Sequence, residues 1–218
     1  MGNARWPLFD LEVRTPRLTL RYIDDGLAEQ VVAVAARGVH DPAVMPFLVP
    51  WTDLPSPHME HEAMRFLWQT RASVRPESWN LQFGVVVDDE VVGLCDLGAN
   101  EFSALRQVKT GSWLGLEFQG QGLGKEFRMA ALTLAFDGLD AEIALTGLWH
   151  DNAASRGVTE SLGYEFVGRH RALRRRAPDE QLDYRMALAH WTTIRRNDIT
   201  LHGVERAREF LGIGATSG

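Results

Sequence analysis

Gln119-Gly120-Gln121-Gly122-Leu123-Gly124-Lys125 places three glycines within five positions, between an apolar run and a predicted helix over residues 126–137. A glycine-rich turn at a helix N-terminus exposes main-chain N–H groups at the positive end of the helix dipole, which suits a phosphate or diphosphate. Glycine also lets phosphate oxygens approach the backbone closely. We therefore expect this turn to hold a phosphate-bearing cofactor through its main chain. A glycine-rich helix start without a ligand is the alternative.

The spacing of these glycines argues against two common phosphate-binding motifs. Counted from Gly120, the last glycine of a dinucleotide fingerprint would fall on Lys125. A Walker loop needs a glycine at position 119 and a serine or threonine at position 126, where this chain has Gln119 and Glu126. Hydride transfer and nucleotide hydrolysis are therefore disfavoured. The pattern that fits is Gln119-x-x-Gly122-x-Gly124.

Length and composition indicate one ordinary globular domain over residues 1–218. Of the 218 residues, 45% are apolar and 24% are charged. The net charge of −6 argues against direct nucleic-acid binding. The single Cys95 cannot form an internal disulfide, no zinc-ligand spacing occurs, and no metal is expected. Because no apolar run approaches the roughly 20 residues of a membrane span, we expect a cytoplasmic protein without a membrane partner.

Apolar periodicity and turn residues predict a mixed α/β fold without repeats or linkers. Asp24 or Asp25 is expected to cap the first helix. The predicted helices cover residues 25–37, 59–73, 126–137 and 153–162, with a partly helical tail over 191–213. The helix over 59–73 is expected to bury Met64, Phe66, Leu67 and Trp68. The predicted strands cover residues 17–22, 79–87, 90–97, 108–117, 141–149, 164–173 and 181–189.

Several separate motifs occur in the order found in the GNAT superfamily of N-acetyltransferases, and the chain resembles its RimJ/RimL branch. The motifs are Thr15-Pro16-Arg17-Leu18-Thr19-Leu20-Arg21, Gly111-Ser112-Trp113-Leu114, the glycine turn, Asp151-Asn152-x-x-Ser155, and Gly163-Tyr164-Glu165-Phe166 with Gly168. The resemblance covers about residues 14–190 and leaves 191–218 as a C-terminal extension. It implies a six- or seven-stranded, mostly antiparallel mixed sheet, flanked by helices, whose central strands splay apart.

The resemblance also implies where acyl-CoA would bind. The cofactor would lie between the splayed strands, with main-chain groups of Leu114, Gly115 and Leu116 bonding its pantetheine arm. Its diphosphate would lie on the glycine turn, formed by Gln119, Gly120, Gln121, Gly122, Leu123, Gly124 and Lys125. Asn152 and Ser155 would face the cofactor arm. The donor is expected to be acetyl-CoA, and succinyl-CoA is the alternative.

The resemblance suggests catalytic roles for two residues. Ser155 would give a proton to the CoA thiolate, and Asn152 would bind the pantetheine or orient a water. Helix capping is the other interpretation of the same Asp-Asn-x-x-Ser sequence. We expect the amine to attack the thioester directly, because a lone Cys95 in an apolar strand is more typical of a core residue than of a nucleophile.

The general base is where this chain departs from the family. Some RimL-like members carry a glutamate on the strand before the glycine turn, and the matching position here is Lys109. The glutamate of those members therefore has no counterpart in this chain, and the general base stays unassigned. Three residues are candidate replacements, although a structural or solvated role is favoured for each: Asp96, Glu101 and His150.

The acceptor side is predicted from the proline-rich loop, with four prolines between residues 42 and 55. Such an apolar loop is either a lid or core cover. In this family it would face the acyl and acceptor groups through His40, Met45, Phe47 and Trp51. The acceptor is expected to be a small-molecule or protein amine, and seven tryptophans permit a homodimer. A CoA-binding module without catalysis is the rival function. Arginines 169, 171 and 174–176 are interpreted as a basic surface turn offset by Asp179 and Glu180.

Overall fold

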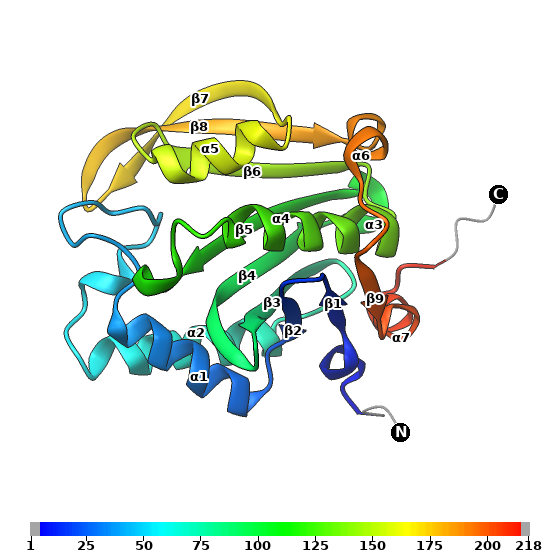
Figure 1. Cartoon of the computed structure of the whole chain (residues 1–218), viewed down its shortest axis with the longest axis horizontal. Coiled ribbons are helices and arrows are strands. Elements are labelled where there is room, and N and C mark those ends of the chain that lie inside the picture. The colour runs from blue at the N-terminus through cyan, green and yellow to red at the C-terminus, as the bar shows by residue number, and fades with distance from the viewer. Residues whose placement is uncertain (1–4, 215–218) are drawn as a thin grey trace.

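Residues 5–214 are described by the computed structural model, and one continuous nine-stranded sheet organises them (Figure 1). The strand order is β7-β8-β6-β5-β4-β3-β2-β1-β9, and all neighbouring pairs are antiparallel except β5 and β6. The strands are β1 (Glu12–Arg14), β2 (Thr19–Tyr22), β3 (Ser78–Val87), β4 (Glu90–Asn100), β5 (Gln107–Leu114), β6 (Ile143–Trp149), β7 (Glu165–Arg174), β8 (Ala177–Ala187) and β9 (Thr200–His202).

Helices cover both faces of the sheet, because successive strand residues point to opposite faces. On β4, Leu94 belongs to an apolar cluster with Leu27 and Leu67 of α1 and α2, whereas Cys95 belongs to the cluster that contains Phe127 of α4. The helices are α1 (Asp25–Arg37), α2 (His58–Ala72), α3 (Phe102–Leu105), α4 (Leu123–Thr133), α5 (Ala153–Ser161), α6 (Leu188–Ile194) and α7 (Val204–Phe210).

The sheet forks between its two parallel strands. β5 and β6 pair only from Gln107 with Ile143 to Lys109 with Leu145. Beyond these pairs β5 runs on to Leu114 and β6 to Trp149 without further pairing between them. β4 and β8 remain paired to the outer edges of β5 and β6, so the predicted splay of the central strands is confirmed.

The fold class is confirmed, and all seven predicted strands are present. Two three-residue strands, β1 and β9, add to them by pairing Val13 with Leu201. They were missed because three residues are too few to show an alternating pattern. The hairpin between β7 and β8 also turns more tightly than expected. Its two turn residues, Arg175 and Arg176, have φ angles of 47° and 70°, which suit a two-residue hairpin turn.

The predicted burial on α2 is wrong for two aromatic residues. Phe66 is 52% exposed and Trp68 is 49% exposed, whereas Leu67 is buried. α2 buries only a narrow stripe that also includes Met59 and Thr70, and Leu67 packs in a cluster with Leu27 of α1 and Leu94 of β4. At α1 the prediction holds, since the Asp24 carboxylate accepts a hydrogen bond from the Leu27 N–H at 2.8 Å.

Within the described part, no helix combines the length and apolar character needed to cross a lipid bilayer. The same residues contain no group of three or more histidine, cysteine, aspartate or glutamate side chains arranged to hold a metal ion.

Candidate functional site

The glycine turn presents a row of open main-chain donors at the start of α4. Gly120 and Gly122 have φ angles of 75° and 78°, which side chains other than glycine rarely adopt. Among residues 5–214, no hydrogen bond is formed by the N–H groups from Gly120 to Lys125. Gly122 precedes α4 and supplies no side-chain cap. The turn therefore has the geometry of an anion site.

The side chains of Gln119 and Lys125, by contrast, form hydrogen bonds within the protein. The Gln119 amide donates to the carbonyls of Val39 and Leu114 at 2.9 and 3.0 Å, which ties the turn to the end of β5 and to the loop after α1. The Lys125 ammonium contacts the Ser161 carbonyl at 3.4 Å. Arg17, which had no predicted role, donates to the Gln121 carbonyl at 2.9 Å and so lies beside the open donors.

The main chain at the end of β5 differs from the expectation in one respect. The N–H of Gly115 donates to Val92 and the N–H of Leu116 donates to Gly38, each at 3.0 Å, so neither is free for a ligand. Donors of alternate strand residues point to alternate edges. Since the Thr110 carbonyl accepts from the Thr146 hydroxyl across the fork, Ser112 and Leu114 direct their main-chain groups into the fork.

A buried arginine closes the fork from the side of α4. Arg128 is 5% exposed, and its guanidinium donates to the hydroxyls of Thr110 at 2.9 Å, Thr146 at 3.2 Å and Ser112 at 3.4 Å. No carboxylate of residues 5–214 lies within ion-pair distance of it, and its Nε has no hydrogen-bond partner there. The sequence signal that could have revealed the buried Arg128 is a single arginine among the apolar residues of α4.

Asn152 and Ser155 lie at the start of α5, beside the end of β6. The Asn152 Oδ1 accepts from the Ser155 N–H at 3.0 Å, so Asn152 caps the helix, as the capping interpretation of this sequence predicts. Ser155 is half-buried, and within the described residues its hydroxyl has no hydrogen bond. The capping fixes the place of Ser155 relative to β6. It leaves the hydroxyl available to a ligand.

A series of contacting aromatic side chains connects the proline-rich loop with β5. His40 and Phe47 lie 5.5 Å apart between ring centroids, Phe47 and Trp51 5.3 Å, and Trp51 and Trp113 6.0 Å. Met45 is buried at 2% exposure. Three of the predicted residues thus form a connected aromatic surface that ends on Trp113, which sequence reasoning had not assigned to the acceptor side.

Two arginines of the β7–β8 hairpin hold this loop in place. Arg174 donates to the Met45 carbonyl at 2.7 Å and pairs with Asp151 and Asp179 at 2.9 and 3.0 Å. Arg175 pairs with Asp53 at 2.6 Å. Burial lowers the pKa of the Arg174 guanidinium, but its pairs with Asp151 and Asp179 outweigh this and raise it, and the pair with Asp53 raises the pKa of Arg175. The basic turn is offset by acidic residues as interpreted, and its arginines additionally fasten a segment distant in sequence.

Replacing Arg174 with methionine is expected to raise the KM for the acceptor about tenfold, because loss of its bonds to the loop costs roughly 1.4 kcal/mol of ordering. The affinity for acyl-CoA should stay unchanged. Steady-state kinetics and calorimetry measure the two quantities. Arg171→Met, an exposed change on the same strand, is the matched control. An equal effect of both changes, or a lower acyl-CoA affinity, would contradict the expectation that the loop faces the acceptor.

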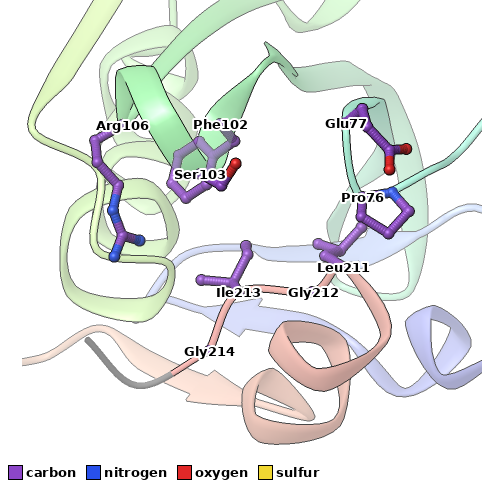
Figure 2. Close-up of a pocket in the computed structure, with 9 residues that line it drawn as sticks. All are labelled: Pro76, Glu77, Phe102, Ser103, Arg106, Leu211, Gly212, Ile213 and Gly214. Atoms are coloured by element: carbon purple, nitrogen blue, oxygen red, sulfur yellow. The ribbon is translucent and has the colours of Figure 1, made fainter. Parts of the chain in front are cut away.

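The cavities that residues 5–214 form outside the fork include one at the glycine turn and one remote from it. One of about 700 Å³ borders the glycine turn and is lined by Gly122, Lys125, Arg17, His190 and Arg196 among others. Its position beside the turn suits the phosphate-bearing end of a ligand, and its lining is mixed in charge, because Glu126 and Glu160 lie among the basic residues. The other, of about 150 Å³, lies between Phe102–Arg106 and the chain around Leu211–Gly214 (Figure 2). It is remote from the turn and contributes nothing to the site.

A sheet that forks at its parallel pair, with an open row of main-chain donors beside the fork, is the arrangement that the resemblance to GNAT acyltransferases predicts. The chain belongs to the GNAT acetyltransferase family, because the Acetyltransferase (GNAT) domain model matches residues 17–165.

Solved structures share this fold at low identity. RimJ from Mycobacterium smegmatis in complex with CoA-disulfide has a TM-score of 0.69 at 19% identity, covering 86% of this chain and 95% of its own. A GCN5-related N-acetyltransferase from Brucella melitensis has a TM-score of 0.67 at 17% identity, covering 83% of this chain and 80% of its own.

Proposed function

We propose that this protein is an acyl-CoA-dependent N-acyltransferase of the RimJ/RimL branch that transfers an acetyl group to a primary amine. The open N–H groups from Gly120 to Lys125 are the observation that carries the proposal. They suit the diphosphate of coenzyme A, and the fork beside them suits the extended arm that bears the thioester. RimJ of M. smegmatis, a structural neighbour, has been solved with CoA-disulfide, which supports the cofactor.

Direct attack of the amine on the thioester is the mechanism we propose. Cys95 is fully buried, and burial raises the pKa of its thiol to about 12, so it is a poor covalent nucleophile. Ser155 would supply the proton that the departing thiolate needs, and the half-buried position of its hydroxyl beside β6 supports this role. Asn152 would orient Ser155 through the cap.

A succinyl donor is the second candidate. The observation that favours it is the buried Arg128 guanidinium, which contacts three hydroxyls in the fork and no carboxylate within residues 5–214. A buried cation without an anion is costly, and a carboxylate on the donor would offset that cost. The acceptor is proposed to be a protein or small-molecule amine, reached through the loop of His40, Phe47 and Trp51.

The test combines native mass spectrometry with acetyl-CoA and succinyl-CoA and a thiol-release assay with a panel of amines. Binding of either donor with turnover supports the proposal, and binding without turnover on any amine favours the non-catalytic module. Failure to bind any CoA species would overturn both.

Ser155→Ala is expected to lower kcat about 100-fold while leaving the affinity for acyl-CoA within threefold, because general-acid catalysis contributes roughly 10² to 10⁴ in rate. Ser161→Ala removes a hydroxyl from the same helix that bonds the Val158 carbonyl, and it should leave kcat unchanged. Steady-state kinetics at saturating donor compares the two. An unchanged kcat in Ser155→Ala would remove the proposed acid.

A further inference from the structure

The carboxylate of Asp96 lies on β4, beside the point where the fork begins to open. Asp96 of β4 is directly opposite Gly111 of β5, two residues beyond the last residue of β5 that pairs with β6. Because Gly111 has no side chain, the carboxylate lies over its Cα, and a Cβ there would come within 2.6 Å of Asp96 Oδ2. The side chain is half-buried.

Asp96 lies on the sheet face that carries the acceptor loop. Side chains alternate along β5, so Gly111 and Trp113 share one face, opposite to Thr110 and Ser112, which contact Arg128. Trp113 contacts Trp51 of the loop, as described above. Asp96 therefore lies on the same face as Trp113, two residues along β4 from Leu94, the strand partner of Trp113.

A second polar group on this face has no partner in the protein. Gln82 of β3 is directly opposite Asp96, is 4% exposed, and both its amide nitrogen and its amide oxygen lack hydrogen bonds within residues 5–214. Opposite residues on neighbouring strands lie about 5 Å apart. A buried amide with neither atom bonded costs free energy unless a ligand or water occupies the site.

The other candidates for a base are placed less favourably. Glu101 follows the end of β4, near the closed end of the fork where β5 and β6 pair. His150 is paired with Asp179, at 3.0 Å between Nε2 and Oδ1, in the network that holds Arg174. Lys109, where some relatives carry glutamate, is exposed and lies on the same face as Asp96.

We propose that Asp96 is the general base that takes the proton from the acceptor amine, with Gln82 positioning the amine or an intervening water. The carboxylate is thus supplied by β4 rather than by the neighbouring strand β5. The inference rests on the proposed N-acyltransferase function.

Each proton that moves during the acyl transfer has a donor and an acceptor. As the amine nitrogen bonds to the acyl carbon and the carbon–sulfur bond breaks, the nitrogen gives one proton to the Asp96 carboxylate. The departing thiolate takes one proton from solvent through the Ser155 hydroxyl. Asp96 then releases its proton to water, which restores the starting state.

The electrostatic environment suits this role. Burial raises the pKa of Asp96 to about 6, against the lowering effects of Arg128 of α4, the Gly111 N–H and Lys109 of β5. A carboxyl of this pKa is about nine-tenths ionised at pH 7, yet it is a stronger base than an ordinary aspartate. Gln82 of β3 is neutral.

The pH dependence of kcat/KM between pH 5 and 9 tests the proposal. In the wild type the rate should fall below about pH 6, as the carboxylate becomes protonated. Asp96→Asn should lower kcat/KM about 100-fold or more and remove this acidic limb, with acetyl-CoA affinity by calorimetry within threefold. Asp96→Glu should retain part of the activity together with the limb.

A second variant should shift the acidic limb of the pH profile without removing the proposed base. Lys109→Met takes away an exposed cation that lowers the pKa of Asp96, so the acidic limb should move to higher pH. In the free protein, a carboxyl ¹³C resonance absent from Asp96→Asn should titrate near pH 6 in the wild type and higher in Lys109→Met.

The stability of the variants gives the folding control. Because the folded pKa of Asp96 is raised, ionisation destabilises the wild type as the pH rises through about 6. Asp96→Asn should therefore unfold at a higher temperature than the wild type above pH 6, and the difference should vanish below pH 4. If the wild type turns over and folded Asp96→Asn keeps its rate and acidic limb, Asp96 is not the base. If the wild type binds no acyl-CoA, the proposed function fails and the inference fails with it.

Discussion

Replacing Gly122 with valine is expected to weaken acetyl-CoA binding at least ~100-fold. Gly122 has a φ of 78°, and a β-branched residue in this region costs roughly 1 to 3 kcal/mol. The chain would relieve that strain by rotating the neighbouring N–H groups away from the ligand. Each lost hydrogen bond to a charged phosphate costs about 1.5 to 3 kcal/mol, so two of them account for a loss of this size.

Isothermal calorimetry with coenzyme A measures the effect. Gly157→Ala is the matched control, because Gly157 lies within α5 and nothing lies within 4 Å of a Cβ added there. It should leave the affinity unchanged and stabilise the helix by about 0.5 to 1 kcal/mol. Gly122→Val with an affinity within threefold of the wild type would show that the main chain of this turn does not hold the diphosphate.

Replacing Trp191 with alanine is expected to lower the free energy of unfolding by about 4 kcal/mol. Trp191 is fully buried, stacks on Phe136 at 5.4 Å between ring centroids, and donates to the Asp137 carboxylate at 2.9 Å. Removal of a buried tryptophan side chain leaves a large cavity and typically costs roughly 3 to 5 kcal/mol. The change tests our proposal that the extension beginning at Trp191 folds with the core as one domain.

Denaturant unfolding at constant pH measures this difference, and Trp68→Ala provides the comparison. Trp68 is 49% exposed, so its replacement should cost less than about 1 kcal/mol. Separate unfolding of the extension, seen as a second transition in the wild type, would contradict the one-domain proposal. So would a cost for Trp191→Ala no larger than that for Trp68→Ala.

Features set by neighbours along the chain were predicted well. The strand predicted over residues 17–22 contains β2, and the strands predicted over 79–87 and 90–97 correspond to β3 and β4, which are joined by a turn at Asp88 and Asp89 with φ angles of 46° and 64°. Asp24 caps α1, and the glycines of the turn adopt left-handed conformations. Each of these depends on residues within one turn or one hairpin, so the local sequence is sufficient.

Features that join distant segments were not predictable in this way. The N–H groups of Gly115 and Leu116 are used by Val92 and Gly38, which periodicity does not reveal. Arg174 reaches Met45 across 129 positions, and the sequence indicated only a surface turn. Phe66 looked buried because it lies next to Leu67, yet the packing of α2 leaves it exposed.

By itself, the sequence determined the seven longer strands, the main helices, the glycine turn and the resemblance to GNAT acyltransferases, because short-range periodicity, glycine conformation and motif order carry that information. Only the tertiary structure decided that Asp96 meets Gly111 at the fork and that Arg128 lies beneath it. It also decided that β9 completes the sheet on β1. The register of paired strands brings these groups together, and register depends on the packing of the whole sheet.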